Sequence, residues 1–403
     1  YAEIVRKPNP PYLQAGAGHS GFIGNKDAYY IGVAAKSGEL MKGLEAALAE
    51  QLRLVQHGFL KSELERAKTQ FLAGFEKFYK EKNKTKSSSF VNEYTKNFTD
   101  GDEIPGIEYE YQFYKKIVPE ISIEEMNSLA GQFLTKENCV FQLSLAEKDG
   151  NTYPTEEEVI RLYDEVASKK YTEWKDVAVN KPLLKKKMKP GKITDEKKND
   201  KLGTVELTLS NGTKAVLKKT NFKDDEILFK AYRFGGSSLA NDDDLPSANQ
   251  AASFISQFGL GELDNTSLQK ALTGKIAGAA PFIGENTEGL DGGSSVKDQE
   301  TMFQMIHLYF TAPRTDNEAY NSIIQRIGAA LENNANSPES IFEDTIQTVL
   351  AGYNKREVPF TKETLSKINI DKVYDFYNER FSNANGFTFF FVGNFDVDSI
   401  KQY

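Results

Sequence analysis

The spacing of apolar positions changes along the chain, and these changes predict the order of its elements. Residues 12–19 and 28–35 alternate as two strands joined by a glycine-containing turn. Apolar residues then recur at helical spacing from Leu44 to Val55, and Gly58 is expected to end that helix. Further helices are predicted near residues 62–78, 86–98, 107–117, 122–134 and 155–169, with a strand at 139–145.

The second half of the chain repeats this order. Residues 204–210 and 213–218 alternate around Asn211-Gly212, which predicts a β-hairpin with a type I′ turn. A third strand is expected at 226–234, followed by helices near 245–258, 264–272, 297–311, 316–334, 338–351 and 370–381 and a last strand near 387–393. Strands, a block of helices and a further strand predict an α+β fold, with mostly antiparallel sheets packed by several helices.

The stretch 170–203 differs from both halves because it is highly charged, contains Pro190 and Gly191 and has almost no apolar periodicity. It predicts a solvated linker; a basic docking patch is the less favoured alternative. We therefore expect one domain over residues 1–169 and a second over 204–403.

An internal similarity supports two related domains. Residues 121–141 align without gaps on residues 368–388. Each copy begins Ile-Ser/Asn-Ile-acidic, which supplies a side-chain cap and a first-turn carboxylate for a helix. Both copies read as helix, short loop and strand, so the first domain is expected to be a similar repeat, truncated at its N-terminus.

The composition of the chain narrows the classes of function that it can have. The chain has 403 residues, 39% apolar and 12% aromatic, enough to bury substantial cores. Its net charge of −8 is spread along the sequence, so nucleic-acid binding has little support. No apolar run is long enough to span a membrane. The lone Cys139 is expected to be buried in a strand. The sequence does not distinguish a periplasmic from a cytoplasmic location.

Three segments carry a resemblance to a known family. They are His57-Gly-Phe-Leu-Lys-Ser-Glu-Leu-Glu-Arg-Ala-Lys68, the hairpin from Leu209 to Lys218 and Phe389-Phe-Phe-Val-Gly-Asn-Phe-Asp396. Together with the duplication they resemble the pitrilysin/insulinase family of zinc metallopeptidases. The resemblance implies four repeats that enclose a peptide chamber. It makes residues 1–150 the later part of repeat two and 204–403 repeat three, an internal segment of a larger parent.

In that family, catalysis resides in repeat one, on a helix bearing His-x-x-Glu-His. Two histidines one turn apart share a Zn²⁺, and the glutamate activates the metal-bound water. The histidines of this chain, His19, His57 and His307, have no such spacing. The resemblance therefore implies no cofactor in this segment and zinc in the missing N-terminal repeat.

The resemblance also marks where a zinc motif would stand in repeat three. Gln250, Ser253 and Phe254 occupy the positions of the two histidines and the base, and Glu332 lies near the position of the distal carboxylate. These four are interpreted as degenerate zinc-motif positions, and a lone Glu332 is more typical of a solvent-facing helix residue.

A second family feature is an Arg and a Tyr that contact substrate across the chamber. Arg6 and Tyr12 occupy a similar loop-to-strand place in repeat two, although their spacing differs. One hypothesis is that this pair contacts substrate. The alternative is that Arg6 is an ordinary residue at a helix end and that Tyr12 is packed in a strand.

These observations predict a non-catalytic, chamber-forming segment of a zinc-dependent endopeptidase that acts on peptides. Its expected partners are the missing catalytic repeat and, through the parent chain, a peptide substrate. The alternative is a catalytically inactive structural or peptide-binding homologue with no active partner repeat.

Overall fold

The computed structural model describes the chain except residues 8, 25, 37, 134, 136, 146–152, 178, 180, 186, 187, 190 and 336. The described chain forms two compact units. Unit 1 comprises Tyr1–Ala67, Ile117–Ala178 and Glu318–Lys362, and unit 2 comprises Lys68–Lys116, Val179–Asn317 and Glu363–Tyr403. The fold is α+β, as predicted.

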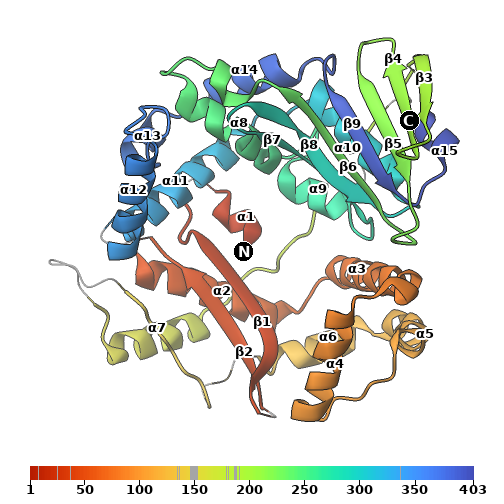
Figure 1. The fold of residues 1–403 in the computed structure, drawn as a ribbon. Coiled ribbons are helices and arrows are strands. Elements are labelled where there is room, and N and C mark those ends of the chain that lie inside the picture. The colour runs from red at the N-terminus through yellow and green to blue at the C-terminus, as the bar shows by residue number, and fades with distance from the viewer. Residues whose placement is uncertain are drawn as a thin grey trace. The chain divides into compact units, whose positions relative to one another are not determined.

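Unit 1 is built on an antiparallel hairpin of β1 (Gln14–Ile23) and β2 (Lys26–Ala34), with a register that runs from Gln14↔Ala34 to Ile23↔Lys26 (Figure 1). The helix α2 (Leu40–His57) packs on β2 and on α7 (Glu156–Ser168). It ends at Gly58, whose φ of +77° suits glycine. The two strands and the glycine stop confirm the sequence prediction.

The core of unit 1 lies between α2 and α7. Leu48 and Leu52 are buried there against Tyr163 and Val166. Their i, i+4 spacing on α2 is the pattern that predicted the helix. The remaining elements of this unit are α1 (Ala2–Val5), η2 (Val118–Glu120), α6 (Ile123–Ala130), α11 (Asn317–Asn334) and α12 (Pro338–Leu350).

Unit 2 contains a seven-stranded sheet in the order β3-β4-β5-β9-β6-β8-β7. Only β5 and β9 run parallel; all other neighbours are antiparallel. The strands are β3 (Ile193–Asn199), β4 (Thr204–Leu209), β5 (Lys214–Lys219), β6 (Ile227–Phe234), β7 (Ala277–Ile283), β8 (Thr287–Ser294) and β9 (Thr388–Gly393).

Helices cover this sheet. Both α8 (Leu245–Phe258) and α10 (Gln299–Thr311) pack on β7, and α14 (Ile370–Phe381) packs on α8 (Figure 1). Phe310 of α10 and Phe381 of α14 form an aromatic core with Phe387 and with Phe389 of β9. The other helices are α4 (Ser87–Asp100), α5 (Ile107–Ile117), η1 (Lys82–Lys84), η3 (Gly236–Leu239), α9 (Asn265–Ala271), α13 (Lys362–Ser366) and α15 (Val397–Lys401).

Charged side chains fix the last turns of α3 (Lys61–Lys80) within unit 2. The Lys80 ammonium lies 3.1 Å from both Glu76 and Asp225, and Lys297 lies 2.5 Å from Glu76. The buried carboxylate of Glu81 accepts a 2.6 Å hydrogen bond from the Asp225 backbone N–H. The helix is therefore held to the sheet loops by paired charges.

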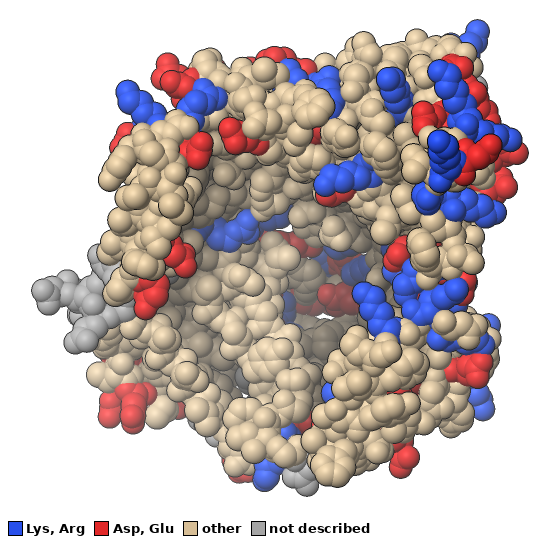
Figure 2. Space-filling view, in the orientation of Figure 1, with Lys and Arg blue, Asp and Glu red and all other residues tan. Residues whose placement is uncertain are grey.

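The expected linker is partly structured, which corrects that prediction. Its residues Ile193–Asn199 form β3, which pairs antiparallel with β4. Backbone pairing needs no apolar side chains. The charged sequence therefore lacks the apolar alternation from which a strand is predicted. The charges suit an edge strand, where they discourage pairing with another chain. Figure 2 shows basic and acidic side chains gathered over this end of the sheet.

Two further predictions are wrong. The turn at Asn211-Gly212 is not type I′, because only Gly212 has positive φ (+83°) and type I′ needs two such residues. Residues 139–145 form no strand, and Cys139 is exposed. In the part of unit 1 that the structure describes, β1 and β2 pair only with each other, so this segment has no strand partner.

A helix able to cross a bilayer is not found among the described residues.

Candidate functional site

The helix α8 carries three of the predicted site residues. It starts beside Pro246 in its first turn and ends at Gly259, whose φ is +101°. Small and aromatic residues at helical spacing bury one side of it against β7 and α14. The buried residues are Ser247, Ala248, Ala251, Ala252, Phe254, Ile255 and Phe258.

The three positions on α8 differ in their surroundings. Gln250 is half-buried and Ser253 is exposed. Phe254 is 0% exposed and packs edge-on against Phe258, with ring centroids 6.0 Å apart. The Ser253 hydroxyl lies 3.3 Å from the Gln257 amide. An amide, a hydroxyl and a core phenyl ring do not form a zinc ligand set.

Glu332 lies on α11, in unit 1, whereas α8 belongs to unit 2. Its carboxylate pairs with Lys362 at 2.5 Å within unit 1. This exposed ion pair accounts for the residue without a metal. A link between Glu332 and the α8 positions stays a prediction.

Arg6 and Tyr12 lie at the start of unit 1. Arg6 follows α1 as its C-cap residue and is half-buried. Tyr12 is 0% exposed, and its ring meets Tyr1 edge-on at 6.1 Å. Burial raises the pKa of the Tyr12 phenol, which therefore stays protonated in the folded chain. In this structure Tyr12 is a packed residue just before β1 rather than a strand residue, and substrate contact by the pair stays a prediction.

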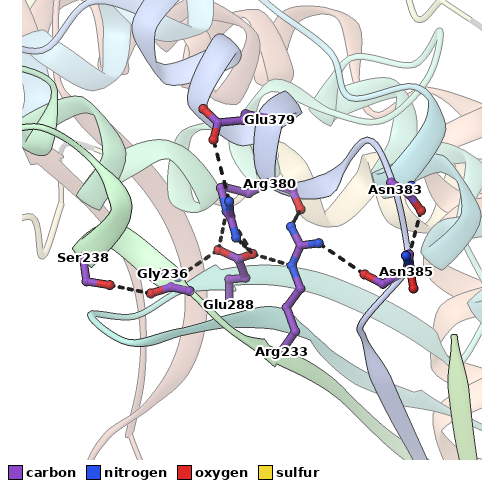
Figure 3. A network of polar contacts seen from close by, with 9 residues as sticks. Arg233, Gly236, Ser238, Glu288, Glu379, Arg380, Asn383 and Asn385 are labelled. Carbon is purple, nitrogen blue, oxygen red and sulfur yellow. Dashed lines mark hydrogen bonds and ion pairs between the residues drawn. The ribbon is translucent and has the colours of Figure 1, made fainter. Parts of the chain in front are cut away.

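Sequence reasoning missed the most strongly bonded polar cluster next to α8. Figure 3 shows Glu288 of β8 between Arg233 of β6 and Arg380 of α14. The Glu288 carboxylate is fully buried, 2.6 Å from Arg233 Nε and 2.8 Å from Arg380 Nη2. The Gly236 backbone N–H also donates to it at 2.9 Å. Arg233 and Glu288 are direct cross-strand partners, which only the strand pairing reveals.

This cluster fixes the path of the chain into α8. Gly236 has φ +71°, and a Cβ there would lie 2.3 Å from the Gly284 carbonyl oxygen. Only glycine therefore fits the turn that brings its N–H to Glu288. Arginine keeps its charge at any physiological pH, so the cluster is suited to hold geometry rather than to transfer protons.

No group of three or more His, Cys, Asp or Glu side chains suited to a metal ion occurs among the residues that the structure describes. The arrangement around α8 can position backbone and helices. It supplies neither a metal ligand set nor an acid and base pair.

Known proteins resemble this chain, although no family model matches it. A protein named zinc protease PQQL-like from Arabidopsis thaliana is 24% identical over 351 residues, which are 87% of this chain and 34% of that protein. A probable zinc protease PqqL from Haemophilus influenzae is 22% identical over 222 residues, 53% of this chain and 23% of that protein. The chain thus spans about a third or less of the curated relatives it matches.

A solved structure shares the fold. The ferredoxin protease FusC, crystallised with Arabidopsis ferredoxin, matches with a TM-score of 0.59 and 15% sequence identity. The match covers 97% of this chain and 44% of that one. Both units therefore have a counterpart within one larger peptidase chain.

Proposed function

Because the chain belongs to the pitrilysin/insulinase-like family of zinc metallopeptidases, we propose that it is a non-catalytic segment of a zinc-dependent endopeptidase acting on peptides. Its repeats form part of the wall of the chamber in the longer parent. Residues 1–169 are the C-terminal part of one repeat, 170–203 connect the two and supply β3 to the second sheet, and 204–403 form the rest of a second, non-catalytic repeat.

The observation that carries this proposal is the burial of Phe254. In a catalytic helix, the residue at this place must offer an imidazole to the metal. Here the side chain is fully enclosed between α8 and its neighbours and contacts Phe258. The helix has the packing of a structural element, while its sequence relatives are named zinc proteases.

The zinc of the parent is proposed to lie in a repeat outside this chain. When bound there it would supply a nucleophilic water. The residues of this chain would shape the chamber, with Arg6 as a proposed substrate contact and Tyr12, which is buried in this structure, as the second member of the proposed pair. Glu288 and its arginines would keep α8 and the strand ends in place.

The test compares this chain with the full gene product. Metal analysis and a peptide-cleavage assay are expected to show no stoichiometric zinc and no hydrolysis for the 403 residues alone. The full product is expected to bind one zinc through a His-x-x-Glu-His motif and to cleave peptides. Full removal of zinc by a chelator should abolish cleavage.

Two results would change this account. One zinc bound tightly by the 403 residues, with hydrolysis, would overturn the non-catalytic assignment. A full gene product without the motif and without activity would favour an inactive structural or peptide-binding homologue.

A further inference from the structure

A cavity of about 470 Å³ lies within unit 1, a volume in the range of small-ligand sites. The hairpin β1–β2, the helix α2 and the start of α3 line it, together with Glu173 and Trp174. All its lining residues belong to unit 1. The proposed function makes no use of it.

Aromatic rings form much of its wall and are held in place. Tyr29 stacks on Phe133 with ring centroids 4.5 Å apart and planes 5° from parallel. The Tyr29 hydroxyl donates to the buried side chain of Gln51, whose amide donates to the Tyr1 hydroxyl at 2.5 Å. Burial raises the pKa of Tyr29 to about 12, so its phenol is neutral. The wall is rigid before any ligand enters.

The charged side chains of the lining are mostly acidic. Three carboxylates, Glu50, Glu63 and Glu173, face one guanidinium, Arg53. Arg53 is occupied, since it pairs with Glu50 at 3.1 Å and also donates to Thr172. Two of the three carboxylates, those of Glu63 and Glu173, are therefore not balanced by a lining cation.

One ring of the lining, that of Trp174, already receives a cation, as does the ring of Tyr171 outside the lining. The Arg53 guanidinium carbon lies 5.8 Å from the ring centroids of both Tyr171 and Trp174. Aromatic faces attract cations through their quadrupole, most strongly where water is excluded. Rings next to unbalanced carboxylates favour an organic cation over an anion or a neutral ligand.

We propose that this cavity binds an organic ammonium or guanidinium group, such as the side chain of a peptide lysine or arginine. Glu63 and Glu173 would balance its charge, and Tyr29, Phe133 and Trp174 would contact its stem. The inference is independent of zinc and of hydrolysis, because every residue it uses lies in this chain.

The experiment uses the only tryptophan of the chain, Trp174, which lines the cavity. Its fluorescence is followed while the 403-residue protein is titrated with Nα-acetyl-lysine amide. Nα-acetyl-norleucine amide serves as the uncharged control and butylamine as a free amine. The lysine probe is expected to give a saturable change, with the norleucine probe at least about tenfold weaker.

Variants locate the site. Glu173→Gln and Glu63→Gln should each weaken binding of the lysine probe by about two- to fivefold, as expected for charge pairs made by exposed carboxylates. Glu63→Gln keeps an oxygen that can accept the Leu60 N–H, which Glu63 now accepts at 2.9 Å. Glu165→Gln, an exposed change on α7 outside the cavity, should leave the titration unchanged.

The outcomes separate the sources of the cation. Equal binding of butylamine and the lysine probe would assign the site to free amines, and tighter binding of the lysine probe to peptide side chains. Equal responses to the lysine and norleucine probes, no response at all, or equal weakening by Glu165→Gln would overturn the proposal.

Discussion

The guanidinium of Arg380 lies against the buried carboxylate of Glu288, with Nη2 2.8 Å from Oε1 and Nε 2.9 Å from Oε2. Arg380 belongs to α14 and Glu288 to β8, so this contact joins a helix to the sheet of unit 2. Hydrogen bonding to Glu288 raises the pKa of Arg380. Since Arg233 donates to the same carboxylate, one buried negative charge contacts two arginines.

Glu288→Gln is expected to destabilise unit 2 by about 3 kcal/mol, because it removes the buried counter-charge of Arg233 and leaves Arg380 with only the exposed carboxylate of Glu379. Urea unfolding followed by circular dichroism measures this. Glu379→Gln is the control, because Glu379 is exposed and 3.7 Å from Arg380; its change should stay within about 0.5 kcal/mol. Similar losses for both variants would contradict the role of the buried charge.

Gly236→Ala should cost at least about 2 kcal/mol, because a side chain at φ +71° is strained and its Cβ would meet two backbone carbonyls. Gly278→Ala is the matched change in the same unit, since a Cβ there meets nothing within 4 Å. The unfolding midpoint in urea compares the two. The prediction fails if Gly278→Ala is as damaging as Gly236→Ala.

The triple variant Gln250→His, Ser253→Glu and Phe254→His gives α8 the sequence His-x-x-Glu-His of a zinc motif. It is expected to bind no stoichiometric zinc, because position 254 faces the core. Loss of the buried phenyl ring should also cost about 3–5 kcal/mol. Metal analysis and urea unfolding test both points.

A double variant that keeps Phe254 is the control for this graft. Gln250→His with Ser253→Glu should unfold close to the unmodified chain, since one position is exposed and the other half-buried. One zinc per triple-variant chain would show that the helix can turn this position outward.

Alkaline pH should destabilise unit 2 through Tyr309. Burial raises the pKa of Tyr309 to about 12, from an ordinary value of 10.0. Between these values the unfolded chain loses the phenol proton and the folded chain keeps it. Stability is therefore unaffected below pH 10 and falls as the pH rises towards 12, by up to about 3 kcal/mol.

Tyr309→Phe should remove this contribution and reduce the dependence of the unfolding free energy on pH, while the buried Tyr377, whose pKa burial also raises, keeps its own share. Tyr353→Phe changes an exposed phenol and should leave the slope as it is. Urea unfolding at several pH values from 8 to 12 compares them. An unchanged slope in Tyr309→Phe would assign the alkaline loss to other groups.

Local patterns in the sequence determined most helices and the central strands. Helix starts are an example, because a cap depends on neighbours three residues away. The Ser122 hydroxyl accepts the Glu125 N–H at 3.1 Å, and the Asn369 side chain accepts those of Asp371 and Lys372. These are the caps that the internal similarity predicted. The charged strand β3 was not predicted, because its pairing with β4 makes it a strand and its composition does not indicate one.

The sequence alone also showed that His19, His57 and His307 cannot supply the family's zinc motif, because that motif requires a fixed spacing along one helix. Only the tertiary structure decided that Phe254 faces the core and that Arg233, Glu288 and Arg380 meet. Those three residues are far apart in the chain, and neither periodicity nor local chemistry links them. Strand pairing and helix packing bring them together, which no local pattern encodes.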